Sequence, residues 1–185
     1  MSLTPSNMLP LGTIAPPFSL IDTISNNTYT LTNLKGRNAT VIAFICNHCP
    51  FVIHINPKLV EIANHYQEKG IRFIAISSND ATKYPQDAPG KMKIHAKENE
   101  YPFPYLYDET QMIAKKYDAA CTPDFYIFDA DVKLVYRGQM DNSRPGNEIA
   151  VTAINLTTAL DALLANKPIK ALQKPSIGCN IKWKN

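Results

Sequence analysis

The chain has 185 residues, of which 45% are hydrophobic and 19% charged, and its formal net charge is +3. This length allows one domain with a sizeable core, and the weak positive charge is too scattered to favour a nucleic-acid partner. Four cysteines are too few for a disulfide-stapled scaffold, and no segment approaches the ~18 apolar residues of a membrane span.

The N-terminal segment, residues 1–17, lacks basic residues and contains four prolines, so it does not have the pattern of a signal peptide. We therefore expect a cytoplasmic protein, in a compartment that keeps thiols reduced.

The first half of the chain predicts a β-hairpin, a buried strand and a helix. Residues 18–20 and 28–31 have the composition of paired strands with a polar turn between them. The apolar run 39–45 predicts a buried parallel strand. Helical periodicity follows over 50–69, where Pro57 predicts a kink or a restart.

The second half predicts further alternation of strands and helices, then a hairpin and a final helix. The expected elements are a strand at 71–77, a helix at 88–99, a short strand at 103–107, a helix at 109–117, strands at 124–128 and 133–136, and a helix at 148–165. Residues 166–185 are rich in Lys and Pro and are expected to wrap the surface. This order predicts an α/β sandwich.

A Cys-x-x-Cys motif, Cys46 and Cys49, lies where the predicted strand 39–45 gives way to the helix. The N-terminus of a helix offers unpaired N–H groups and partial positive charge, which favour a thiolate. This placement predicts thiol–disulfide exchange. The alternative is half of a zinc site, which would need His48, His54 or Cys121 as further ligands because the chain has no second such motif. We favour redox chemistry and expect no metal and no cofactor.

Six short motifs resemble those of the thioredoxin superfamily, and more narrowly of peroxiredoxin-like redoxins (alkyl hydroperoxide reductase/thiol-specific antioxidant) that carry a thioredoxin-style Cys-x-x-Cys. The resemblance covers roughly residues 8–165. The motifs are Ala15-Pro16-Pro17-Phe18-Ser19-Leu20, Leu34-Lys35-Gly36, Cys46 to Pro50, Ser77-Ser78-Asn79-Asp80, Cys121-Thr122-Pro123-Asp124-Phe125 and Arg137-Gly138-Gln139.

This resemblance implies a thioredoxin fold with an N-terminal β-hairpin and an extended C-terminal tail. We expect one redoxin domain over 1–165, with the tail, 166–185, packed on it. Thr122 and Pro123 resemble the loop that presents a cis-proline to the active disulfide throughout this superfamily, so we expect Pro123 to be cis and to face the pair.

The chain departs from both the peroxiredoxin motif and the thioredoxin motif. In the peroxiredoxin motif Pro-x-x-x-Thr-x-x-Cys, Ile42 stands at the Pro position and Cys46 at the Thr position if Cys49 is the nucleophile, so the peroxide-activating group is incomplete. Thioredoxin usually has an aromatic residue before its first Cys, and this chain has Ile45 at that position. Its buried carboxylate on the preceding strand is replaced by Thr40, which removes a familiar proton acceptor.

Within the pair, we expect Cys46 to be the exposed, attacking thiolate and Cys49 the covered, resolving thiol. His48 is expected to stabilise the Cys46 thiolate, as in disulfide isomerases and disulfide oxidases that carry His at this position. Cys121 either lies near the active pair or only fills a tight loop, and we weigh these readings evenly. For Cys179, tail anchoring by its neighbours is favoured over a role as a resolving thiol.

The resulting prediction is an oxidoreductase that reduces or exchanges disulfides. Its partners would be a disulfide-bearing protein or small-thiol substrate and an upstream thiol reductant. Two alternatives stay open, an antioxidant thiol peroxidase that uses Cys49 and a non-catalytic redox or metal-binding module.

Overall fold

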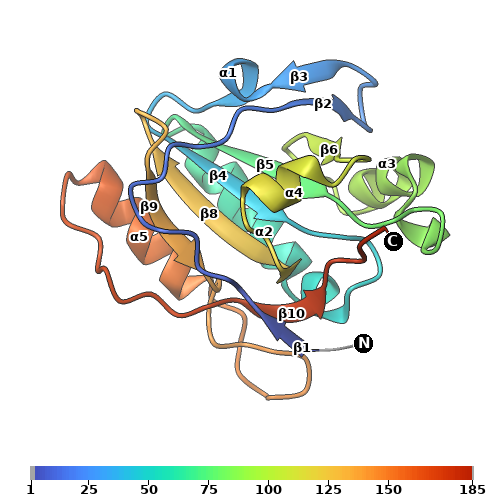
Figure 1. Cartoon of the computed structure of the whole chain (residues 1–185). Helices are drawn as coiled ribbons and strands as arrows, with labels where there is room; N and C mark the ends of the chain where they lie inside the picture. Colours follow the sequence, from blue (N-terminus) through green and yellow to red (C-terminus); the bar gives the residue numbers. More distant parts are fainter. Residues whose placement is uncertain (1–2, 185) are drawn as a thin grey trace.

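The fold is built on a mixed seven-stranded sheet, shown in Figure 1 from a computed structural model that describes residues 3–184. Its strand order is β3-β2-β6-β5-β4-β8-β9. The strands are β2 (Ser19–Asp22), β3 (Thr28–Thr30), β4 (Ala39–Phe44), β5 (Ile71–Ser77), β6 (Tyr105–Tyr107), β8 (Asp124–Asp129) and β9 (Leu134–Gly138). The central strand β4 pairs parallel with β5 and antiparallel with β8.

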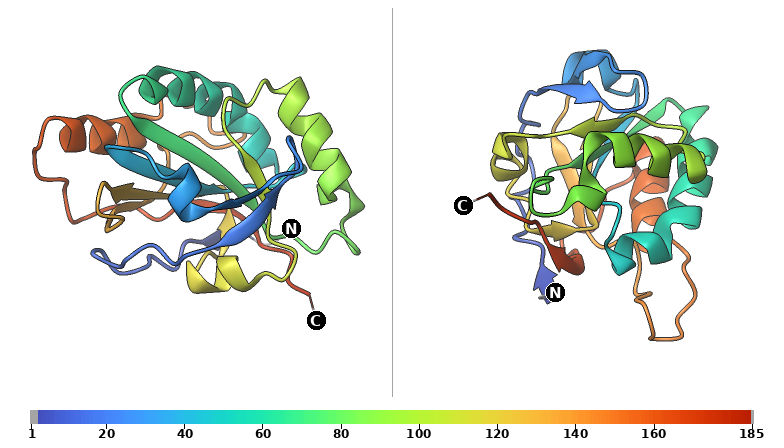
Figure 2. Two further views of the ribbon diagram at one scale, coloured as in Figure 1. Left: turned by 90° about the horizontal axis from the view of Figure 1, so that it is seen from above. Right: turned by 90° about the vertical axis from the view of Figure 1, so that its right-hand side faces the viewer.

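Helices cover both faces of this sheet, as the left view of Figure 2 shows. The helices are α1 (Leu31–Leu34), α2 (Pro50–Gln67), α3 (Pro89–Glu98), α4 (Met112–Lys116) and α5 (Ile154–Leu164), with a 3-10 turn at Pro85–Asp87. Alternate residues of β4 point to opposite faces. Val41 and Ala43 pack with α2, α3 and α5, whereas Ile42 and Phe44 pack with α1 and α4.

A second, three-stranded sheet joins the two ends of the chain to its middle. Strand β10 (Ile177–Asn180) lies between β1 (Leu3–Pro5) and β7 (Cys121–Thr122), and pairs antiparallel with both. In Figure 1 the red β10 lies beside the blue β1, near the start of α2. The C-terminal tail is thus brought next to the loop that precedes Pro123.

The structure confirms the predicted α/β class and thioredoxin-type architecture, and β5 has the predicted bounds. Helix α2 is continuous through Pro57, so the restart, one of the two outcomes expected there, does not occur. The predicted start of the last helix at 148 is wrong, because α5 begins at Ile154, six residues later. At Thr152 and Ala153 the backbone N–H groups donate to Asp141 instead of entering a helical turn, and Ala153 has φ 58°.

No helix among residues 3–184 is both long and apolar enough to cross a membrane.

Candidate functional site

Cys46 and Cys49 lie in the loop between β4 and α2, at the edge where the central strand ends. Cys49 is the residue that caps the N-terminus of α2, and its side chain makes no capping hydrogen bond. Cys46 is 1% exposed and Cys49 0%. The expectation of an exposed Cys46 is therefore wrong, because both cysteines are buried.

Thr122 lies against both thiols. Its hydroxyl oxygen is 3.4 Å from Cys46 Sγ, and its carbonyl oxygen accepts a hydrogen bond from the Cys49 thiol at 3.1 Å. The peptide bond between Thr122 and Pro123 is cis. The predicted cis-proline and its place beside the cysteine pair are both confirmed.

His48 faces a buried carboxylate that sequence reasoning missed. Its Nδ1 lies 2.7 Å from Oδ2 of Asp87, a residue with 0% exposure, and its ring stacks on Tyr84 with centroids 5.7 Å apart. No hydrogen bond of good angle forms at Nδ1, so the contact is one between charges when the ring is protonated. Asp87 lies in a loop before a predicted helix, where no motif distinguishes it from a surface residue.

Asp87 also fixes the Cys-x-x-Cys loop. Its carboxylate accepts hydrogen bonds from the backbone N–H of Asn47 at 2.9 Å and from the Asn79 amide at 2.8 Å. The hydroxyl of Tyr105 donates to the Asn47 side chain at 3.1 Å. The loop is therefore held by buried polar contacts from two other segments, and a carboxylate is present near the pair although Thr40 replaces the one expected on the strand.

The surroundings of the two active-loop sulfurs shift their pKa values in opposite directions, which favours the negative charge on Cys49. The pKa of Cys49 is lowered to about 5, chiefly by its hydrogen bond with Cys46; burial acts in the opposite direction, and the hydrogen bond with Cys179 lowers the pKa further. The pKa of Cys46 is raised, first by that same hydrogen bond, then by burial and the nearby Asp87 carboxylate. The hydroxyl of Thr122 acts in the opposite direction. The expected stabilisation of a Cys46 thiolate by His48 does not appear among these causes.

The other two cysteines, Cys179 and Cys121, differ in what their sulfurs contact. The sulfur of Cys179 lies 3.0 Å from that of Cys49, so the favoured reading of Cys179 as a residue of a merely anchored tail is incomplete. The thiol of Cys121 instead contacts the carbonyl oxygen of Pro123 at 3.7 Å, and burial raises its pKa above the ordinary range.

Three possible metal ligands gather at the loop among the described residues. Donor atoms of Cys46, His48 and Asp87 all lie within 4.8 Å of one another. Neither His54 nor Cys121, named as possible zinc ligands from the sequence, belongs to this group. The Asp87 carboxylate already accepts hydrogen bonds from Asn47 and Asn79. These hydrogen bonds account for the position of the cluster without a metal ion.

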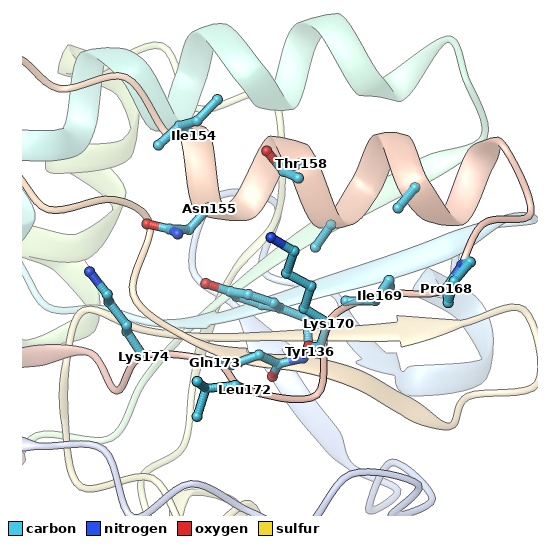
Figure 3. Close-up of a pocket in the computed structure, with 12 residues that line it drawn as sticks. Tyr136, Ile154, Asn155, Thr158, Pro168, Ile169, Lys170, Leu172, Gln173 and Lys174 are labelled. Carbon is cyan, nitrogen blue, oxygen red and sulfur yellow. Dashed lines mark hydrogen bonds between the residues drawn. The ribbon is translucent and has the colours of Figure 1, made fainter.

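A cavity lies away from the cysteines, between α5 and the tail. It has a volume of about 390 Å³, and Figure 3 shows Tyr136, Lys170 and Gln173 among the side chains around it. No cysteine lines it. The cysteine pair lies elsewhere, in the β4–α2 loop.

Comparisons with known proteins agree with this fold. An uncharacterized conserved protein from Geobacillus kaustophilus is 60% identical, with a TM-score of 0.98 over 100% of this chain and 97% of that one. A hypothetical protein from Sinorhizobium meliloti is 45% identical, with a TM-score of 0.95 over 98% of each chain. A putative thiol:disulfide interchange protein from Chlorobium tepidum shares the fold at 18% identity, with a TM-score of 0.68 over 84% of this chain and 99% of that one.

A search of curated proteins found no match. The redoxin family model matches residues 10–154. That range holds the β4–α2 loop with its cysteine pair, His48, Asp87 and the Thr122–Pro123 turn. The chain therefore belongs to the redoxin family and has a thiol-based redox function.

Proposed function

We propose that the protein is a thiol–disulfide oxidoreductase that works through a Cys46/Cys49 dithiol–disulfide couple. The observation that carries the proposal is the position of the two cysteines at the N-terminus of α2, with Thr122 in contact with both sulfurs. A thiolate paired with a neighbouring thiol is the reactive form for disulfide exchange.

The reaction proceeds in two exchanges. Cys46, a thiol in the resting pair, gives up its proton as its sulfur attacks one sulfur of a substrate disulfide, which forms a mixed disulfide and releases the other substrate sulfur as a thiolate. Cys49 then attacks the Cys46 sulfur, so that the Cys46–Cys49 disulfide forms and the second substrate thiolate leaves. The substrate gains two electrons and the dithiol loses two. An upstream thiol reductant restores the dithiol.

His48 and Asp87 supply a route for the proton of Cys46. Their donor atoms and the Cys46 sulfur lie within 4.8 Å of one another, and the imidazolium formed on proton uptake is paired with the Asp87 carboxylate. This arrangement offsets the raised pKa of Cys46. It assigns His48 a role as proton acceptor in place of the purely electrostatic role predicted from the sequence.

Burial of both thiols favours particular substrates. Because Cys46 and Cys49 are 0–1% exposed, a rigid, folded protein surface is less able to approach their sulfurs than a small disulfide or a disulfide on a flexible segment. We therefore propose small-thiol disulfides and flexible protein disulfides as substrates, in the cytoplasmic setting expected from the sequence.

The test is to trap each half of the reaction. Cys49→Ser and Cys46→Ser proteins are incubated with oxidised glutathione, and adducts are read by intact mass and peptide mapping. Cys49→Ser should accumulate a stable glutathione adduct on Cys46, because the resolving thiol is gone. Absence of any adduct on Cys46 would contradict the proposal.

A second candidate, a thiol peroxidase using Cys49, is favoured by the lowered pKa of Cys49, about 5. In that reaction the Cys49 thiolate takes an oxygen from the peroxide to give a sulfenic acid, and a thiol then condenses with it to give a disulfide and water. Ile42 and Cys46 stand where the peroxide-activating Pro and Thr would be. Rapid sulfenic acid formation at Cys49 in the Cys46→Ser protein, at micromolar peroxide, would decide for this candidate.

A further inference from the structure

The C-terminal strand places a third sulfur in the active cluster. In the antiparallel pairing of β10 with β7, Cys179 lies opposite Thr122. Directly opposite residues of paired strands present their side chains on the same face. Because Thr122 faces the active pair, Cys179 does so too, and its sulfur lies 3.0 Å from Cys49.

This position is built into the fold. A Cβ on Gly178 would come within 2.0 Å of the Thr122 carbonyl oxygen, so only glycine lets β10 approach the loop this closely. On one side of Cys179, the backbone N–H of Ser176 donates to the Ser6 hydroxyl at 3.0 Å, and the Ser176 hydroxyl donates to the Gly138 carbonyl at 2.8 Å. On the other side, the backbone N–H of Lys182 donates to Asn79 at 2.8 Å. Cys179 is 3% exposed, so its nearest reactive partner is Cys49 and not a molecule in solvent.

We propose that Cys179 is a third redox cysteine, which exchanges with the Cys46–Cys49 disulfide to form an alternative Cys49–Cys179 disulfide. This inference rests on the proposed Cys46/Cys49 couple. In the step, the Cys179 thiolate bonds to the Cys49 sulfur, the Cys46–Cys49 bond breaks, and Cys46 leaves as a thiolate. No electrons are gained or lost overall, and the proton given up by Cys179 is matched by the one that Cys46 can take up. The exchange returns a reduced Cys46 to the loop while the protein stays oxidised.

Charge in the cluster makes the step depend on the redox state. In the dithiol state the pKa of Cys179 is raised to about 12, first by burial and then by its hydrogen bond and charge interaction with Cys49. Once Cys49 is in a disulfide, its negative charge is gone, and burial, which raises the pKa of Cys179, is then opposed by the positive charge of Lys182, which lowers it. Cys179 therefore becomes a better nucleophile when there is a disulfide for it to attack.

The test uses the Cys46→Ser protein, in which the normal disulfide cannot form. It is treated with oxidised glutathione, digested without reduction and mapped. We expect an internal Cys49–Cys179 link, with a mass lower by two hydrogens than the reduced protein and no retained glutathione. The amount of the Cys49–Cys179 link should exceed the amount of any link to Cys121 by more than ~10-fold, because neighbouring sulfurs have a high effective concentration.

Two matched variants complete the experiment. Cys46→Ser/Cys121→Ser should form the same link, and Cys46→Ser/Cys179→Ser should instead retain glutathione on Cys49. A Cys46→Ser protein that keeps glutathione on Cys49 while Cys179 stays reduced would overturn the inference.

Wild-type protein provides a measurement without substitution. Oxidised wild type should contain the Cys46–Cys49 link and a minor Cys49–Cys179 link, and a map with Cys46–Cys49 alone counts against the third cysteine. If the proposed function fails, wild type lacks the Cys46–Cys49 link, whatever Cys46→Ser shows. The two failures are therefore distinguishable.

Discussion

Cys121 and Cys179 lie on neighbouring strands and are both buried, yet only Cys179 reaches the active pair. Cys121 precedes Thr122, so on an extended strand the two side chains point to opposite faces. Thr122 contacts both active thiols, and Cys121 instead lies by the Pro123 carbonyl. Cys179 is opposite Thr122 and shares its face. Strand register, more than distance along the chain from Pro123, decides which thiol is chemically coupled.

The largest expected effect separates the active pair from Cys121. Cys49→Ser should lower the rate of disulfide reduction on the order of 10³-fold, because it removes the sulfur that every exchange in the cluster uses, and Cys46→Ser should lower it less, because Cys49 and Cys179 can still form a disulfide. Cys121→Ser should keep wild-type activity, since its sulfur contacts the Pro123 carbonyl and the Ser6 side chain and makes no hydrogen bond with the active pair that the described residues show. Turnover with a small aromatic disulfide measures all three. Loss of activity in Cys121→Ser together with retention in Cys46→Ser would reverse the comparison.

The next prediction tests whether His48 accepts the proton of Cys46. His48→Phe keeps an aromatic ring beside Tyr84 but removes the proton acceptor facing Asp87. The rate of Cys46 attack near neutral pH should fall by about 10²-fold, the usual contribution of a positioned base. The pH profile of the mixed-disulfide step in a Cys49→Ser background measures this.

Tyr84→Phe is the matched control, because it keeps the stacked ring and His48. An unchanged pH profile in His48→Phe would assign the ring to packing alone.

A smaller effect concerns the side of the cis-proline loop that faces away from the active pair. Asp124 is buried there, where it accepts hydrogen bonds from Ser6 at 2.6 Å and Tyr126 at 3.0 Å, and burial raises its pKa to about 7. The unfolded chain ionises near 4, so between about pH 4 and 7 the unfolded state has released the proton that the folded state still holds. The contribution of Asp124 to stability is full below pH 4 and falls by up to ~1.4 kcal/mol per pH unit as pH rises to 7.

Urea unfolding at pH 5 and pH 8 measures this contribution. Asp124→Asn should flatten the decline in the free energy of unfolding, while the exposed Asp131→Asn should not. Equal declines in wild type and Asp124→Asn would show that this carboxyl does not titrate in that window.

The smallest effect is expected at Thr122, which lies between the active pair and Cys121. Thr122→Val removes the hydroxyl that lies 3.4 Å from Cys46 and keeps the shape of the side chain. One hydrogen bond contributes ~1 kcal/mol, so Cys46 attack should slow by a few fold, and Thr122→Ser should restore it. The rate of glutathione adduct formation on Cys49→Ser provides the measurement. Equal rates for Val and Ser would remove the hydroxyl from the mechanism.

Sequence patterns predicted the features that depend on local periodicity. Strand β5, the strand–loop–helix around Cys46 and Cys49, and the position of Pro123 all follow from short motifs or apolar runs. The place of Cys179 could not be predicted, because it depends on the register of a four-residue strand paired with a two-residue strand far along the chain. Neither strand is long enough to show an alternating pattern.

The role of Asp87 was missed for a related reason. It lies in a 3-10 turn that only the folded chain brings against His48 and Asn47. A single buried carboxylate in a loop has no sequence signature. Sequence reasoning also placed the thiolate on Cys46 from the thioredoxin pattern, whereas the additional thiol of Cys179 helps to place the charge on Cys49. An unpredicted neighbour therefore changed the predicted electrostatics.

The central claim is that Cys46 and Cys49 form a reversible dithiol–disulfide couple. The most direct test is a redox titration of wild-type protein in glutathione buffers, with non-reducing peptide mapping at each step. The account predicts one reversible two-electron transition in which the Cys46–Cys49 link is the main oxidised species. Oxidation that leaves Cys46 as a thiol and converts Cys49 to sulfenic or sulfinic acid, with no internal disulfide at any step, would contradict it.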